Sequence, residues 1–204
     1  HSLTMTNCTL GGGLTTTSDG GQLYSAGTTT ISNVAFNQNK ATNGGAIYNT
    51  VEKTSTGVIS GRGILNLNNT TFTNNTATTN GGAIYNAGTV VFTGTNVFTG
   101  NTAAGAANDI YNATGGTVTI AEGTTTLNRG IVTAGTVNLE GGNLTVASLE
   151  QTGGLLSIKG GTLNVSTTFK NIGYSASAGV SITNGALQTG NTVLVNKNGD
   201  SYTI

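Results

Sequence analysis

The six residues Gly-Gly-Ala-Ile-Tyr-Asn occur at 44–49 and again, letter for letter, at 81–86. Looser copies of the same phrase occur at 20–25 and 107–112, so it appears four times in the first half of the chain. Internal repeats with a period of twenty to fifty residues are typical of solenoids and other stacked architectures. This one phrase therefore predicts a repeat fold.

A second phrase, Phe-x-x-Asn, alternates with the first. Its aromatic residues are Phe36, Phe72 and Phe98, and Leu10 occupies the same place in an earlier repeat. The interval between Phe36 and Phe72 is longer than the other two intervals, and the extra residues lie near 50–62. Insertions in a solenoid usually leave the coil as loops, so we expect an inserted loop there.

Apolar and polar residues alternate in short runs bounded by Gly or Asn, as in half-buried β-strands. Strands this short gain enough pairing partners when the chain winds into a solenoid and each strand pairs in parallel with its equivalent one coil away. Crossovers between parallel strands are overwhelmingly right-handed. We predict one all-β domain over 1–204, a right-handed parallel β-helix of about nine coils with three short strands per coil. Longer coils, each of about two dozen residues, are expected over 1–112, and shorter coils, most of them of about twenty residues, over 113–204.

The stacking gives each repeated residue a structural role. Ile47, Ile84 and Ile110 are expected to form one inward ladder, and the Phe residues a second one. Side-chain amides at equivalent corners are expected to bond to one another and to the turn backbone. These are Asn39, Asn75 and Asn101 at one corner and Asn49, Asn86 and Asn112 at another.

The composition excludes several partners. The 204 residues have a net charge of zero, and only 7% of them are charged. Without a basic patch, neither a nucleic acid nor an anionic membrane surface is an expected partner. No apolar run is long enough to span a bilayer and no signal peptide is recognisable. We expect this chain to be a piece of a longer polypeptide that meets the membrane only through other regions.

The acidic residues do not favour an enzyme. A glycoside-cleaving site on such a scaffold would need paired carboxylates, and the seven acidic residues form no cluster at the repeat spacing. Glu140 and Lys159 are separated by one short coil, as are Glu150 and Lys170, so we expect surface ion pairs between successive coils. We predict no catalytic residue, no metal site and no cofactor. The lone Cys8 is expected to be an ordinary strand residue.

Two features are candidates for binding. Tyr24, Tyr48, Tyr85 and Tyr111 each follow an inward Ile or Leu, so alternation turns them outward as an aromatic ladder. Exposed aromatic rings could hold a sugar or a partner protein, or they could only stabilise one another. The insertion near 50–62 carries Glu52, Lys53 and Arg62. It is either a binding loop or a surface loop with no role in binding.

The alternating Gly-Gly-Ala-Ile and Phe-x-x-Asn phrases resemble the polymorphic outer-membrane proteins of chlamydiae and similar adhesin-like autotransporter passengers. The resemblance covers residues 20–112 by motif and the remainder by periodicity alone. It implies an extracellular, outer-membrane-associated location and adhesion to a host-cell or matrix glycan or protein.

Two other classes of function remain open. The chain could be a structural surface fibre whose coil ends associate end to end, because open coil ends expose unpaired backbone. It could also be a polysaccharide-active enzyme, although the distribution of acidic residues argues against that class.

Overall fold

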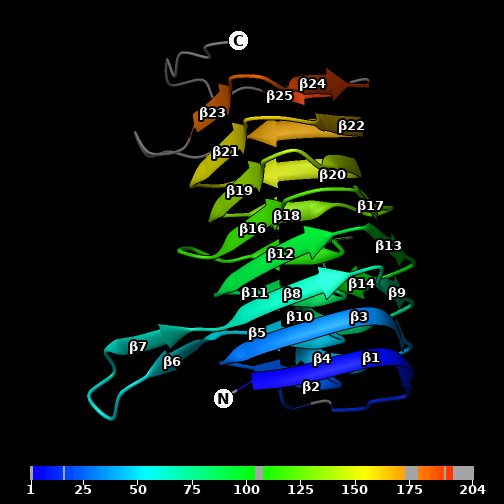
Figure 1. The fold of residues 1–204 in the computed structure, drawn as a ribbon, viewed down its shortest axis with the longest axis vertical. Coiled ribbons are helices and arrows are strands. Elements are labelled where there is room, and N and C mark those ends of the chain that lie inside the picture. The colour runs from blue at the N-terminus through cyan, green and yellow to red at the C-terminus, as the bar shows by residue number, and fades with distance from the viewer. Residues whose placement is uncertain (1, 16, 104–107, 173–178, 191, 195–204) are drawn as a thin grey trace.

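The chain winds around a single axis as a stack of β-strands (Figure 1). The computed structural model describes residues 2–15, 17–103, 108–172, 179–190 and 192–194, and in these ranges the regular structure is all β. The strands of successive coils pair in parallel with their equivalents, for example Ile84 with both Ile47 and Ile110. The predicted parallel β-helix is therefore confirmed.

Three faces run along the stack, each named here after one of its strands. The β8 face contains residues 2–6 of β1 (Ser2–Gly11), residues 28–32 of β3 (Thr28–Asn37), β8 (Ile64–Asn68), β12 (Thr89–Thr93), β16 (Thr117–Ile120), β19 (Thr136–Leu139), β21 (Leu155–Ile158) and β23 (Gly179–Ile182). The described ranges thus hold eight successive strands on this face, compared with the nine or so coils predicted.

The next two faces complete each coil. The β13 face contains the second halves of β1 and β3, β9 (Thr71–Thr73), β13 (Thr95–Thr99), β17 (Thr124–Leu127), the first halves of β20 (Asn143–Gln151) and β22 (Thr162–Asn171), and β24 (Ala186–Thr189). The β11 face contains β2 (Leu23–Ser25), β5 (Ile47–Asn49), β11 (Ile84–Asn86), β15 (Ile110–Asn112), β18 (Ile131–Thr133), the second halves of β20 and β22, and β25 (Thr192–Leu194).

Two small sheets add to the three faces. β4 (Lys40–Asn43), β10 (Thr76–Asn80) and β14 (Thr102–Ala103) pair in parallel, which gives these coils a short fourth strand. β6 (Val51–Lys53) and β7 (Ile59–Arg62) form an antiparallel hairpin that projects sideways from the stack (Figure 1). The insertion expected as a loop is therefore a β-hairpin, because its two arms satisfy each other's backbone groups once they leave the coil.

The winding is right-handed. In Figure 1, β8 and β12 run from left to right across the front, the chain returns behind them, and it rises from the N-terminus towards the C-terminus. This is the handedness that parallel crossovers prefer.

The core consists of the predicted ladders. Phe36, Phe72 and Phe98 are fully buried and stacked, with ring centroids 4.9 Å and 4.4 Å apart. Leu127 follows Phe98 in the same register, so the ladder continues with aliphatic side chains in the shorter coils. Burial of apolar surface contributes about 25 cal/mol per Å², and the stacked equivalents form one continuous cluster through the molecule.

A ladder of buried amides lines one corner of the second to fourth coils. The Nδ2 of Asn39 donates to the Oδ1 of Asn75, and the Nδ2 of Asn75 donates to the Oδ1 of Asn101, both at 2.9 Å. The amides thus all point the same way along the axis. A ladder with this polarity needs an extra donor at one end and an extra acceptor at the other.

Gln22 and Asp109 supply these two end groups. The Nε2 of Gln22 donates to the Oδ1 of Asn39 at 3.0 Å, and Asp109 Oδ1 accepts from the Nδ2 of Asn101 at 2.9 Å. Both residues occupy the repeat position that is Ala46 and Ala83 in the two perfect copies of the motif. The two imperfect copies therefore differ at the place where the amide ladder begins and ends.

Glycine allows the coils to approach at the corner before the β11 face. Gly44 has a positive φ of 60°, which side chains with a Cβ rarely adopt. A Cβ on Gly45 would clash with the carbonyl oxygen of Gly82 one coil away. The Gly-Gly pair is therefore a packing requirement of the stack.

Candidate functional site

The tyrosine ladder lies on the outer side of the β11 face. Strand register places Tyr24, Tyr48, Tyr85 and Tyr111 directly above one another. Their rings are stacked, with centroid distances of 5.3, 4.8 and 5.4 Å along the series. Tyr24 is 61% exposed and the other three are partly buried. The ladder is thus continuous and open at the Tyr24 end.

The two central hydroxyl groups of the ladder, those of Tyr48 and Tyr85, have a pKa raised above its ordinary value. Burial, the Asp19 carboxylate and the adjacent Tyr24 raise the pKa of Tyr48, against a lowering by the hydrogen bond with Thr50. Burial and its two Tyr neighbours also raise the pKa of Tyr85. The ladder is therefore a neutral surface with flat apolar faces and a row of polar tips, a combination that suits sugars and protein partners.

The aromatic strip ends abruptly after four coils. Tyr111 pairs with Val132, and Val132 pairs with Glu150, which pairs in turn with Lys170. Lys170 Nζ lies 3.1 Å from Glu150 Oε1, so an ion pair replaces the aromatic rings on the upper part of this face. The candidate binding surface is confined to the coils that carry exact or looser copies of the Gly-Gly-Ala-Ile-Tyr-Asn phrase.

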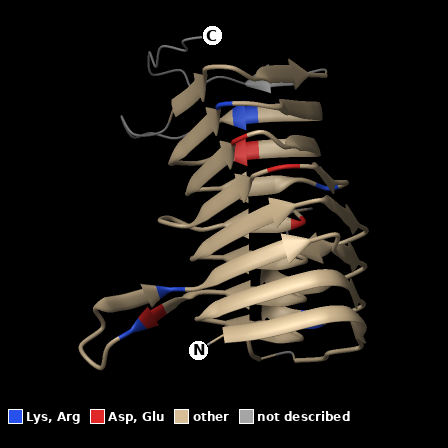
Figure 2. Ribbon diagram, in the orientation of Figure 1, with Lys and Arg blue, Asp and Glu red and all other residues tan. Residues whose placement is uncertain are grey.

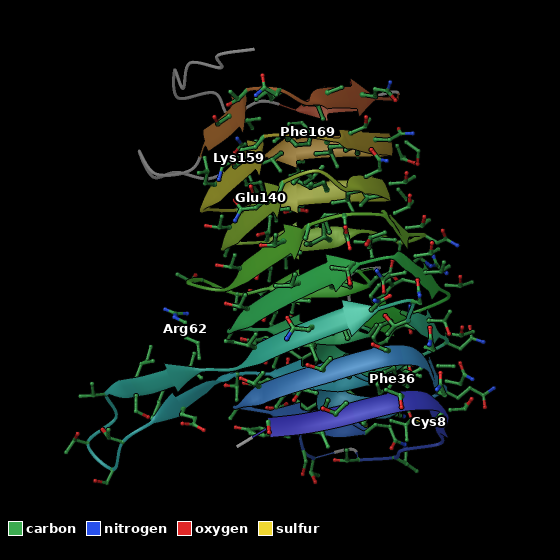
Figure 3. All side chains as sticks on the ribbon, in the orientation of Figure 1. Cys8, Phe36, Arg62, Glu140, Lys159 and Phe169 are labelled. Atoms are coloured by element: carbon green, nitrogen blue, oxygen red, sulfur yellow. The ribbon has the colours of Figure 1, made fainter. Side chains whose placement is uncertain are left out.

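The residues singled out in the insertion separate in the structure. Glu52 shares a small pocket of about 260 Å³ with Tyr24, so one residue of the hairpin borders the ladder. Arg62 instead donates from Nη1 to the carbonyl oxygen of Gly115 at 2.7 Å and fastens the hairpin to the stack (Figure 3). Lys53 is exposed on β6, and the hairpin contributes most of the charge on the lower part of the molecule (Figure 2).

The tip of the hairpin is the polar run from Thr54 to Gly57, and two exposed aliphatic side chains follow it. Val58 and Ile59 are 63% and 49% exposed. The predicted role of this segment in binding stays a prediction.

The acidic residues lie apart from one another. The predicted Glu140–Lys159 ion pair is confirmed, with 3.2 Å between Oε1 and Nζ, and Figure 3 shows the two residues one above the other. Asp109 is buried and accepts hydrogen bonds from the backbone N–H groups of Arg129 and Gly130 at 2.8 and 3.1 Å. Within the described ranges, no group of three or more His, Cys, Asp or Glu residues is arranged to bind a metal. The absence of enzymatic activity stays a prediction.

Comparison with protein families adds an independent observation. The family model for the Chlamydia polymorphic membrane protein repeat matches residues 33–50 and 69–87. Two segments of the chain thus match this repeat model. Each matched polymorphic membrane protein repeat begins at the turn before a Phe strand and continues through a Gly-Gly-Ala-Ile strand of the β11 face. The matched repeats therefore include Tyr48 and Tyr85 at the centre of the ladder.

The other comparisons add no further relative. No curated protein and no solved structure matches the chain significantly. In the residues that the structure describes, no helix has the length and apolar character needed to cross a membrane.

Sequence reasoning missed two groups of residues. The first is the pair Gln22 and Asp109, for which the signal was the replacement of Ala in the two imperfect motif copies. The second is a row of outward asparagines, Asn7, Asn33 and Asn69, which repeat at the same intervals as Leu10, Phe36 and Phe72. Periodicity alone could have found both groups, but only the structure shows which way their side chains point.

Proposed function

We propose that this chain is a segment of a surface-exposed, autotransporter-like passenger with an adhesin role. The tyrosine ladder would contact a glycan or protein of a host cell or matrix. The polymorphic membrane protein repeats support a location at the bacterial cell surface, outside the outer membrane. The stacking of coils along a single axis supports a part that extends away from that surface (Figure 1).

One observation carries the binding role. Four stacked rings form an aromatic strip with Tyr24 open to solvent, and Glu52 of the hairpin borders its open end. Aromatic side chains combine a large apolar area with little loss of conformational entropy, which is why they dominate many recognition surfaces.

The test compares binding of three proteins to immobilised glycans and to host-cell surfaces. These are the unchanged chain, a variant with all four ladder tyrosines changed to Ser, and a variant with all four changed to Phe. Loss of binding in the Ser variant and retained binding in the Phe variant would support recognition by the ring faces. Equal binding by all three would refute a role for the ladder.

A structural fibre is the second candidate. The supporting observation is the ten-residue strand β1, which contains no charged residue. Charged side chains are one means by which proteins prevent a strand from pairing with another chain. Sedimentation at increasing concentration separates the two functions, since a fibre subunit should elongate whereas an adhesin segment should stay monomeric.

A polysaccharide-active enzyme is the third candidate. Incubation with plant and host polysaccharides, followed by measurement of released reducing ends, tests it. Release of reducing ends would show that the chain cleaves polysaccharide although its carboxylates lie apart.

A further inference from the structure

We infer that the chain has a second binding site, a groove for a neutral, linear glycan, at the corner between the β8 and β13 faces. This groove has a volume of about 470 Å³ and its lining includes Asn7, Asn33, Asn69, Cys8, Thr9 and Thr71. We call it the Asn groove. It lies on faces different from the tyrosine ladder, so the inference does not depend on the proposed function.

The chain forms this corner in the same way in three successive coils. Asn7, Asn33 and Asn69 have positive φ angles of 52°, 56° and 51°. Asn tolerates this left-handed conformation better than most residues, which bends the chain between the two faces. The bend leaves all three side chains exposed on the outside. Three equivalent amides therefore form a row parallel to the axis, about 4.8 Å apart as successive parallel strands are.

The amides keep free hydrogen-bonding capacity. Asn33 Nδ2 donates to Asn7 Oδ1 at 3.1 Å, and Asn69 Oδ1 accepts from the N–H of Thr95 at 2.8 Å. In the described part of the chain, no protein partner is found for Asn7 Nδ2, Asn33 Oδ1 or Asn69 Nδ2. The row thus presents two donors and one acceptor at the coil spacing. Sugar hydroxyl groups both donate and accept, so a chain of sugar units can satisfy such a row.

The remaining lining determines the class of ligand. Thr9, Thr71 and the apolar residues Val34 and Ala35 complete the lining beside the amides and Cys8, and the groove is lined by no Lys, Arg, Asp or Glu. A sulfated or carboxylated glycan would lose solvation there without meeting an opposite charge. The groove therefore favours a neutral glycan over an acidic one.

Cys8 provides a direct probe of occupancy. It is the only cysteine of the chain, it is exposed, and it lines the groove. Figure 3 labels it on β1. We propose to measure the rate of Cys8 alkylation by a maleimide. The ligands are neutral hexose and N-acetylhexosamine oligosaccharides of increasing length, with heparin-derived sulfated oligosaccharides for comparison. Slower alkylation with the longer neutral oligosaccharides is the expected result.

The variant that tests the amides is the triple substitution Asn7→Gly, Asn33→Gly and Asn69→Gly. Glycine keeps the left-handed turns while it removes the amides. We expect the apparent affinity from Cys8 protection to fall at least about tenfold, which corresponds to about 1.4 kcal/mol. The matched control is Gln38→Gly with Asn74→Gly, two other positive-φ positions that lie outside the groove lining. This control should retain protection.

Three results would overturn the inference. These are no protection by any neutral oligosaccharide, equal protection in the triple-Gly variant, and protection by sulfated oligosaccharides that matches or exceeds that by neutral ones. The tyrosine-to-serine variant separates the two proposals, because it should lose ladder binding and keep protection of Cys8. Circular dichroism of each variant would verify that the fold is retained.

Discussion

Asp109→Asn tests whether a carboxylate is needed at the end of the buried amide ladder. In the native chain, Asp109 Oδ1 accepts from Asn101 Nδ2, while Oδ2 accepts from the backbone N–H groups of Arg129 and Gly130. An amide has only one oxygen, so its Nδ2 must face at least one of these donors. Asn101 cannot rotate to compensate, because its own Oδ1 already accepts from the N–H and Nδ2 of Asn75.

The expected loss of unfolding free energy follows from the number of donors that lose an acceptor. In its better orientation, the amide at 109 accepts from the two backbone N–H groups and sets its own Nδ2 against Asn101 Nδ2, so two donor groups face each other without an acceptor. Leaving such buried donors unpaired costs about 1–3 kcal/mol of unfolding free energy. The amide is neutral, so the variant no longer buries a charge, and this gain offsets part of that cost. Asp109→Ala should cost more, because the two backbone N–H groups lose their acceptor and Asn101 Nδ2 keeps only the carbonyl oxygen of Phe72. Ala46 and Ala83 show that this repeat position accepts alanine, so backbone strain would not explain the loss.

The assay is urea unfolding followed by far-UV circular dichroism at neutral pH. Glu122→Gln is the matched control, since it removes the same charge from an exposed side chain and should change stability by less than about 0.5 kcal/mol. An Asp109→Asn variant as stable as the native chain would refute the argument from donor and acceptor matching.

The native chain and Asp109→Asn should also differ in how their stability depends on pH. Burial raises the pKa of Asp109 above its ordinary value of 3.8, against the lowering by its hydrogen bonds. The folded chain therefore takes up the proton at a higher pH than the unfolded chain. As the pH falls from the raised folded pKa to 3.8, the native chain should gain stability relative to Asp109→Asn, and the gain should level off below 3.8. A relative loss over that window would show that the hydrogen bonds outweigh burial.

Three further predictions concern the stack itself, and urea unfolding measures each of them. Phe72→Ala removes a ring stacked on both sides and should cost about 3–5 kcal/mol; a smaller loss would mean that the ladder collapses around the cavity. Gly45→Ala should cost about 1–3 kcal/mol or more because backbone must move, whereas Gly179→Ala, whose new Cβ has ordinary space, should be close to neutral. Lys159→Gln should cost at most about 1 kcal/mol, and added salt should erase the difference, since both partners of its ion pair are well exposed.

Repetition explains why the ladders and ion pairs could be predicted. In a parallel stack, residues one repeat apart in sequence become neighbours in space, so spacing alone placed Phe36 under Phe72 and Glu150 under Lys170. The tyrosine ladder followed from the same register combined with strand alternation. These relations depend on the period and not on the identity of any neighbour outside the repeat.

The sequence by itself thus determined the solenoid, its core ladders and its outward tyrosines, because each follows from translation by one coil. Tertiary structure alone decided the features that break this translation. It paired the two arms of the insertion into a hairpin and directed Arg62 to the stack. It also turned Gln22 and Asp109 inward to end the amide ladder. For the asparagines that do repeat, the structure shows that Asn33 lines an outer groove. The direction in which a corner side chain points depends on the backbone angles at the turn and on the space left by adjacent coils, and neither is encoded in the period.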